Sequence, residues 1–262
     1  MTLCKSKSDQ SIFLFAHQDD EAGVFFTIQK ELKRGSDVYC MYLSSGTRTF
    51  DNKLIKKRNN ESLAVLKALG VNPNNIHFSE SLGNFLDQTL IKNINEITKK
   101  VEKFIRNKNC CTLYVPAWEG GHPDHDALNV VAAFLCYKHP LIKSFQFSLY
   151  NANKRSKYFF NVISPIDKNG PVITDQIPSE NIMLYLKLCC YYPSQIKTWI
   201  ALYPFFLLHF IFLRKQFLQK IIFSRIFERP HKGLLYYEAR NFISYNEVSN
   251  FIKRSYFDIL KK

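Results

Sequence analysis

The sequence of 262 residues contains no C-x-x-C cysteine pair and no glycine-rich phosphate-binding loop. Its seven cysteines are an odd number, and four of them form the adjacent pairs Cys110–Cys111 and Cys189–Cys190. Adjacent cysteines make a poor framework for ordinary disulfides, so we expect reduced, buried thiols. No G-x-G-x-x-G or Walker pattern follows an expected strand, which argues against nucleotide binding of those kinds.

The sequence also shows no signal-peptide-like stretch in its first ten residues and no low-complexity segments. Its first ten residues contain no apolar stretch of signal-peptide length, which predicts a cytoplasmic protein. No internal repeat or low-complexity linker is visible. A hydrophobic content of 46% is enough for a sizeable core, so we expect one large domain or a core domain with an appendage.

Positive charge is concentrated in the second half of the chain. Residues 1–138 contain 18 Lys and Arg against 15 Asp and Glu, whereas residues 139–262 contain 18 against 7. The net charge of +14 therefore comes mostly from the C-terminal half. This bias predicts attraction to anionic surfaces such as phospholipid, polyanionic glycan or nucleic acid.

The first 150 residues alternate between short apolar runs and helical patterns. The expected strands are Ile12–Ala16, Asp37–Ser44, Asn75–Ser79 and Cys111–Pro116, followed by Lys143–Asn151 and Lys157–Ser164. Helical spacing of apolar residues covers 20–33, 57–69, 89–106 and 127–135, with a further helix after Ser179. This alternation predicts a three-layer, Rossmann-like α/β sandwich with a mostly parallel sheet. Residues 165–178 are expected to form turns.

Two segments rich in histidine and aspartate follow expected strands. His17, Asp19 and Asp20 come after the first strand, and the segment G-G-H-P-D-H-D at 120–126 comes after the fourth. In parallel sheets, ligands bind beyond the carboxyl ends of the strands, so the two segments should meet at one edge. Imidazole and carboxylate are common zinc ligands, and a catalytic zinc needs three of them.

Each segment also has a simpler interpretation. Aspartates after a strand can cap the following helix, with His17 incidental to that role. The sequence H-P-D-H can be a surface turn. The metal interpretation is favoured because both segments fall at equivalent ends of separate strands.

The motifs A-H-Q-D-D-E and G-H-P-D-H resemble those of the LmbE-like or PIG-L family of zinc-dependent N-deacetylases. The family pattern is A-H-P-D-D-E with a later H-x-D-H. Weaker similarities are the loop Leu43–Arg48, the segment R-N-N-E-S-L-A that begins at Arg58, and Tyr192–Gln195. Together they cover most of residues 10–195.

The resemblance implies a role for seven residues. The zinc ligands would be His17, Asp20 and His125, with another divalent ion such as Fe²⁺ as an alternative. Asp19 would be the general base, His122 would stabilise the oxyanion or protonate the leaving amine, and Asp124 would fix a neighbouring histidine. Arg58 would help to bind substrate. Gln18 replaces the usual proline, which should loosen the turn without removing a ligand.

The implied reaction is hydrolysis of the N-acetyl group of a glucosamine unit, which releases acetate and a free amine. The group attached to the sugar differs between family members and includes small-molecule and lipid-linked conjugates. Two alternatives remain open at this point. The same machinery can cleave a larger acyl amide, or the chain can be a non-catalytic membrane- or glycan-binding protein with a relict metal site.

Residues 1–195 are assigned to the catalytic domain, and 196–262 to a basic, aromatic-rich helical region that either packs on it or contacts a membrane peripherally. Trp199–Leu213 counts only 15 residues, too few for a spanning helix. Apolar residues from Phe217 to Ile226 recur at helical spacing between basic residues and predict an amphipathic helix. No nucleic-acid-binding motif accompanies the charge, so no nucleic-acid partner is expected. The oligomeric state is left open.

Overall fold

A mostly parallel sheet forms the centre of the computed structural model, which describes residues 9–106, 111–155 and 160–260. In these residues seven strands make one sheet, in the order β3-β2-β1-β4-β5-β9-β8. Their bounds are β1 Gln10–Phe15, β2 Asp37–Tyr42, β3 Ile76–His77, β4 Cys111–Pro116, β5 Lys143–Phe147, β8 Val172–Gln176 and β9 Lys215–Lys220. Neighbouring strands from β3 to β5 run parallel, whereas β9 is antiparallel to both β5 and β8. The short strands β6 (Tyr150–Asn151) and β7 (Asn161–Val162) pair separately.

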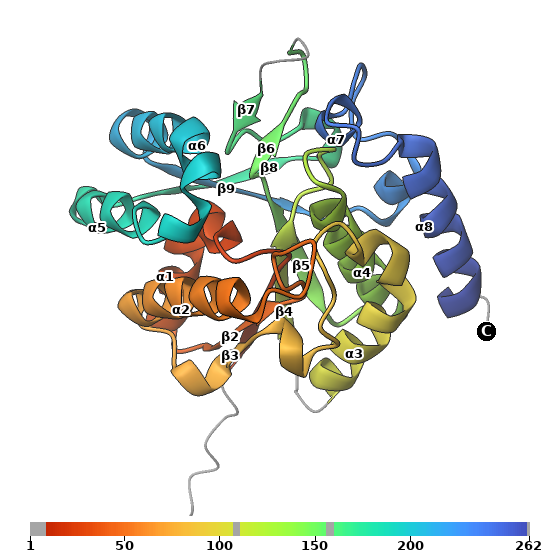
Figure 1. The fold of residues 1–262 in the computed structure, drawn as a ribbon, viewed down its shortest axis with the longest axis horizontal. Helices are drawn as coiled ribbons and strands as arrows, with labels where there is room; N and C mark the ends of the chain where they lie inside the picture. Colours follow the sequence, from red (N-terminus) through yellow and green to blue (C-terminus); the bar gives the residue numbers. More distant parts are fainter. Residues whose placement is uncertain (1–8, 107–110, 156–159, 261–262) are drawn as a thin grey trace, which may run out of the picture.

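Helices cover both faces of this sheet (Figure 1). One layer contains α1 (Phe25–Lys33), α2 (Asn52–Leu69), α5 (Ser179–Cys189) and α6 (Ile196–Leu208). The other contains α3 (Ile94–Arg106), α4 (Pro123–Lys138) and α8 (Tyr245–Leu260), with the short α7 (Tyr236–Ala239) near its upper end. The predicted three-layer sandwich and the helical C-terminal region are therefore confirmed.

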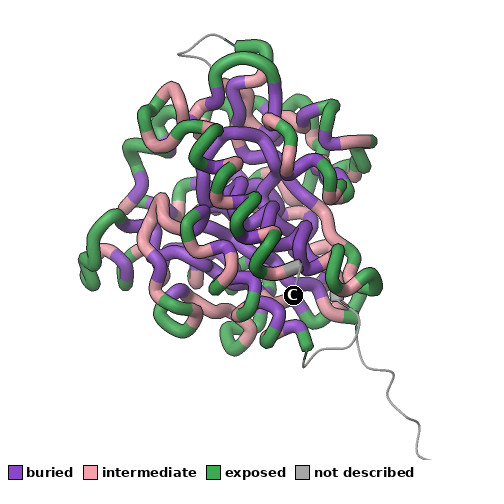
Figure 2. Tube along the Cα trace, turned by 90° about the vertical axis from the view of Figure 1, so that its right-hand side faces the viewer, coloured by how far each residue is buried: buried purple, intermediate pink, exposed green. Residues whose placement is uncertain are grey.

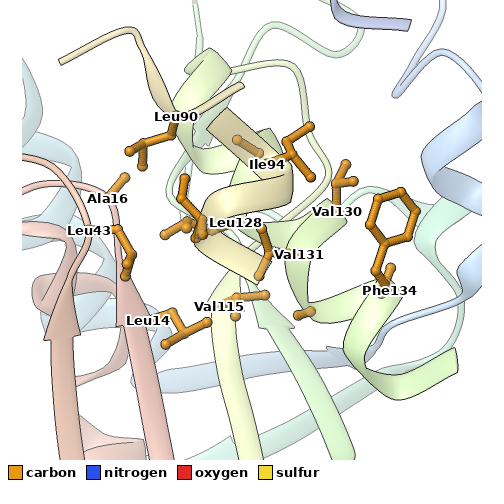
Figure 3. Packing of buried hydrophobic residues seen from close by; sticks show 14 of the residues in the cluster. Leu14, Ala16, Leu43, Leu90, Ile94, Val115, Leu128, Val130, Val131 and Phe134 are labelled. Atoms are coloured by element: carbon orange, nitrogen blue, oxygen red, sulfur yellow. The ribbon is translucent and has the colours of Figure 1, made fainter. Parts of the chain in front are cut away.

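Alternate residues of β1 supply the two cores between these layers. Ile12 and Leu14 belong to the core under α3, α4 and α8, whereas Phe13 and Phe15 belong to the core on the other face. Figure 3 shows Leu14 among the buried side chains that pack between the sheet and α4. Because helices cover both faces of the sheet, the residues of β1 from Ile12 to Phe15 are all apolar. The buried interior extends through the centre of the molecule (Figure 2).

The predicted elements of the first half agree with the structure to within a few residues. Helix 20–33 begins as a 3₁₀ turn, Asp20–Val24, before α1, and the segment 89–106 likewise begins as Leu90–Asn93 before α3. Gly70 ends α2 with φ +100°, a left-handed conformation that glycine adopts without a side-chain clash. The strand expected at Lys157–Ser164 is reduced to β7, and residues 157–159 lie outside the described chain.

The amphipathic helix predicted for Phe217–Ile226 is wrong. Residues up to Lys220 form the antiparallel strand β9, and a short 3₁₀ turn, Phe223–Phe227, follows. Gln216 and Gln219 in β9 are buried, and their side-chain amides donate to the carbonyl oxygens of Gly23, Ile166 and Gly170. Pairing with β5 and β8 and these buried bonds override the helical spacing, which is a local signal.

Two further expectations about the second half were also wrong. The turn-rich segment 165–178 contains the strand β8. The apolar helix is longer than 15 residues, because the continuous helical stretch Pro193–Leu213 has 21. By length and composition it is the one described helix that could cross a membrane. Its end, His209–Leu213, winds as a π-helix after α6.

Candidate active site

The candidate site lies at the carboxyl ends of β1, β2 and β4. His17, Asp19 and Asp20 follow β1, as the sequence predicts. The loop after β4 ends at His122, which caps the amino terminus of α4, and His125 lies in the first turn of that helix. His125 and Asp20 are 105 residues apart in sequence, yet their side chains are in contact.

Asp20 connects these two segments through both of its carboxylate oxygens. Oδ2 accepts the backbone N–H groups of Ala16 and His17 at 2.8 and 2.9 Å, which fixes the side chain. Oδ1 lies 3.0 Å from His125 Nε2 and 3.9 Å from His17 Nδ1. Burial raises the pKa of Asp20, but His125 and His17 outweigh it and lower the pKa to about 2. The carboxylate is therefore ionised at neutral pH.

These three residues fit a divalent metal ion. Ligand atoms of His17, Asp20 and His125 all lie within 4.8 Å of one another. His125 Nε2 faces Asp20 Oδ1, whereas its buried Nδ1 has no hydrogen-bond partner in the described chain. Two imidazoles and one carboxylate are the protein ligands of many catalytic zinc sites. The structure thus brings together the three residues that the sequence analysis names as ligands.

A second cluster faces the other ring nitrogen of His17. His17 Nε2 lies 3.0 Å from Asp87 Oδ1 and 3.4 Å from Asp124 Oδ2. His122 Nε2 lies 3.4 Å from the same oxygen of Asp87. Burial raises the pKa of Asp87, but His17 and His122 outweigh it and hold the pKa well below its usual range. Asp87 is therefore an ionised carboxylate between two histidines.

Asp124 is placed behind the pocket rather than in it. Its side chain is fully buried, and its oxygens accept the backbone N–H groups of Gln88 and Leu90 at 2.7 and 2.9 Å. These bonds tie α4 to the loop that carries Asp87. Asp124 also lies next to His17, and a carboxylate beside a histidine is a common arrangement around metal ligands.

Asp19 has a strained backbone and a side chain that contacts Trp199. Its φ of +118° is rare for a residue other than glycine, and such strain is often found at functional sites. The backbone N–H donates to Glu21 Oε2 at 3.0 Å, and the side-chain Oδ2 accepts the indole N–H of Trp199 at 3.2 Å. Burial, with the neighbouring Asp20 and Glu21, raises the pKa of Asp19 well above its ordinary value. The Asp19 carboxylate is therefore a stronger proton acceptor than an ordinary aspartate.

His122 is held as a neutral ring. Its Nδ1 accepts the backbone N–H of Asp124 at 3.2 Å, which leaves the proton of a neutral imidazole on Nε2. Burial, together with His17 and His125, lowers the pKa of His122 well below its ordinary value. The Nε2–H group points toward Asp87 and the pocket. His122 is therefore arranged as a hydrogen-bond donor.

Gln18 stands at the position where the family pattern has proline, and side-chain contacts hold it in place. Gln18 is fully buried, its Nε2 donates to Asn59 Oδ1 at 2.7 Å, and its backbone oxygen accepts the side chain of Gln195. Its Oε1 lies against Gly46, where an added Cβ would come within 2.2 Å of it. Gly46 in turn accepts a hydrogen bond from Arg58 through its carbonyl oxygen. The turn is therefore fixed by contacts to α2 and to the loop after β2.

These residues surround a pocket of about 210 Å³. Six of the seven predicted residues line it, namely His17, Asp19, Asp20, Arg58, His122 and His125. The lining that the sequence did not predict includes Asp87, Tyr150, Gln195, Trp199, Leu202 and Phe206. A wider outer pocket of about 570 Å³ shares Asp87, His122 and Tyr150, and adds aromatic rings and the cations Arg48, Lys197 and Arg240.

Asp87 was missed because it lies in an irregular segment. It follows Phe85, which forms an isolated parallel bridge with Ser44 at the end of β2. Its backbone N–H donates to Thr47 O at 2.9 Å, so the loop runs along the same edge of the sheet. Only its position in the sequence could have identified Asp87. An acidic residue that follows the third strand should lie at the same edge of the sheet as His17.

The model of the PIG-L family, described as GlcNAc-PI de-N-acetylase, matches residues 12–135. Residues 12–135 of this chain are therefore similar to a PIG-L family domain. The match includes both motifs that supply the predicted metal ligands. The match confirms the resemblance seen in the sequence and supports a hydrolytic N-deacetylase. No curated protein matches the chain in a sequence search.

Solved structures of deacetylases have the same fold. A deacetylase of the teicoplanin biosynthesis pathway superimposes with a TM-score of 0.61 and 14% identity, covering 81% of this chain and 98% of that chain. The N,N'-diacetylchitobiose deacetylase of Pyrococcus horikoshii gives a TM-score of 0.58 with 18% identity, covering 84% and 86%. A zinc-inhibited form of the teicoplanin deacetylase gives 0.60 with 13% identity, covering 81% and 98%. At these low sequence identities, the comparisons show that the fold is shared.

Proposed function

We propose that this protein is a zinc-dependent N-deacetylase that removes the acetyl group from an N-acetylglucosamine-type sugar conjugate. The observation that carries the proposal is the convergence of His17, Asp20 and His125 beside the strained Asp19 in one pocket. The family description and the chitobiose deacetylase among the structural relatives support an amino sugar as substrate.

His17, Asp20 and His125 would hold the ion. Zinc bound there would lower the pKa of water from about 15.7 to about 7 and polarise the amide carbonyl. Asp20 Oδ1 is available for this role because Oδ2 is already occupied by two backbone N–H groups. The donor set also suits Fe²⁺, so the bound metal should be identified by reconstitution with each ion.

Asp19 accepts the proton of the attacking water. Its raised pKa suits a general base, and the Trp199 indole holds the carboxylate at one oxygen, which leaves the other for the proton. His122 donates Nε2–H to the oxyanion that develops on the acetyl carbonyl. Because the pKa of His122 is lowered, a neutral donor fits its surroundings better than an imidazolium that protonates the amine.

The remaining pocket residues would bind the sugar. Asp87 is an ionised acceptor at the border of the inner and outer pockets, where sugar hydroxyl groups can donate to it. Arg58 lines the inner pocket beside Gly46 and can donate to the conjugate. The outer pocket, with its aromatic rings and Arg48, Lys197 and Arg240, would take the group attached to the sugar.

The test is acetate release from N-acetylglucosamine conjugates by zinc-loaded protein, with matched conjugates that carry longer acyl chains in place of acetyl. We expect acetate release by the wild type, and its loss in Asp19→Ala with zinc still bound. Asp9→Ala, a change of an exposed aspartate far from β1's carboxyl end, is the matched control and should retain activity. Preferential cleavage of the longer acyl amides would replace the deacetylase with an amidase, and no cleavage of either would leave a binding protein.

A further inference from the structure

The outer face of α6 is apolar and exposed. Ile200, Phe205, Leu208 and Phe212 lie on this face at helical spacing, with exposed fractions of 69%, 44%, 53% and 74%. Between Lys197 and Arg214 the sequence has no lysine, arginine, aspartate or glutamate. Surface helices of soluble proteins normally present charged and polar residues to water. This face is therefore suited to contact with something other than water.

The inner face of the same helix is packed against the protein. Trp199, Phe206 and Phe210 are buried, and Trp199 stacks on Tyr192 with ring centres 5.2 Å apart. The helix is thus apolar on both sides, with one side already covered. Withdrawing it to cross a bilayer would expose these rings and break the bond from Trp199 to Asp19. A position in the plane of the interface preserves both.

Charge distinguishes between two occupants of the exposed face. A second copy of this chain would also carry a net charge of +14 and would be repelled. An anionic lipid surface would be attracted, and Lys197, Arg214 and Lys215 stand at the two ends of the apolar stretch. Basic residues that flank an apolar helical face are typical of interfacial helices.

We propose that the outer face of α6 and of its π-helical end docks on an anionic phospholipid membrane. Figure 1 shows α6 at the periphery of the molecule, on the side opposite α8. Because Thr198 and Leu202 of the same helix line both pockets, docking places the pocket entrance close to the lipid headgroups. The helix would then serve as a wall of the site and as its attachment to the membrane. The proposal does not depend on which amide the site cleaves.

The test is co-sedimentation of the full chain with vesicles of phosphatidylcholine alone or mixed with phosphatidylserine. We expect binding to the mixed vesicles at low salt and its weakening by added salt. Phe212→Asp should reduce this binding about tenfold or more, because a largely exposed aromatic ring no longer enters the interface. Leu141→Asp is the matched control, since Leu141 is 85% exposed but lies between α4 and β5.

Three results would overturn the proposal. The first is no binding to mixed vesicles at low salt. The second is an equal loss of binding in Phe212→Asp and Leu141→Asp, which would show that no particular face is used. The third is a lipid-free dimer that Phe212→Asp dissociates, which would make a second copy the occupant. Cleavage of a water-soluble substrate should be unchanged in Phe212→Asp, so failure of docking and failure of the proposed reaction are distinguished.

Discussion

Asp20 Oδ1 lies 3.0 Å from His125 Nε2, and this contact joins the segment after β1 to the first turn of α4. Backbone N–H groups of its own turn hold the Asp20 carboxylate, and His125 lies in the helix. The contact therefore brings the two side chains together as candidate ligands for one cation.

Loss of either partner should abolish metal binding. Removing a residue that only hydrogen-bonds to a metal ligand lowers metal affinity by about 10–100-fold. We expect a larger fall in Asp20→Ala and in His125→Ala, because each removes a ligand. Metal content after dialysis against a dilute chelator, measured by mass spectrometry, checks this. Asp9→Ala should keep the wild-type content. A full complement of metal in Asp20→Ala would mean that the ion binds elsewhere.

Asp19→Asn should slow catalysis without releasing the metal. The amide cannot accept a proton, so kcat should fall by about 10²–10⁴. The acceptor for the Trp199 indole is retained, so the fold should be unchanged. Steady-state kinetics and metal content are measured on the same samples. Wild-type kcat with metal bound would exclude Asp19 as the base.

Asp87→Asn should weaken metal binding although Asp87 is absent from the family motifs. Its carboxylate lies 3.0 Å from His17 Nε2 and orients the ring whose other nitrogen faces Asp20. We expect affinity for zinc to fall by about 10–100-fold. The KM for a sugar conjugate should rise as well if Asp87 also accepts sugar hydroxyl groups. If the zinc affinity and the KM were both unchanged, the contact between Asp87 and His17 would have no functional role.

Glu31 predicts a pH-dependent contribution to stability away from the site. Burial raises its pKa, but hydrogen bonds from Ser11, Arg34 and Ser36 outweigh burial and lower it. A carboxyl group with a lowered folded-state pKa stabilises the protein above its unfolded pKa of about 4.3, and this contribution is lost as the pH falls through the folded value.

Glu31→Gln should therefore reduce the free energy of unfolding by about 1–3 kcal/mol at neutral pH, with a smaller difference from wild type in acid. Urea unfolding at several pH values measures both. Glu180→Gln, at an exposed position, should change the free energy by less than about 0.5 kcal/mol. A difference for Glu31→Gln that does not change with pH would point to packing rather than charge.

Much of the site could be predicted because its functional residues follow directly after two strands. His17 and Asp20 follow a continuous apolar run, and His125 follows another, so the rule for parallel sheets brings them to one edge. Asp87 and Trp199 could not be found in this way. Asp87 lies in a loop without periodicity, and Trp199 reaches Asp19 from a helix 180 residues away in sequence.

The second half of the fold was harder to predict for a related reason. The segment Lys215–Lys220 is a strand because it pairs with β5 on one side and with β8 on the other. Its apolar residues also fit a helix, and nothing local to the sequence decides between the two. Tertiary pairing decides, and the antiparallel β9 continues the parallel sheet between β5 and the edge strand β8.

The central claim is that one zinc ion, held by His17, Asp20 and His125, makes this chain an N-deacetylase. The most direct test is to strip the metal, return zinc in measured amounts, and follow acetate release from a soluble N-acetylglucosamine conjugate. We expect activity to rise in proportion to bound zinc until each chain holds a single ion, and to be absent in the stripped protein. Full activity without metal, or zinc bound at this site with no acetate released from any conjugate, would contradict the account.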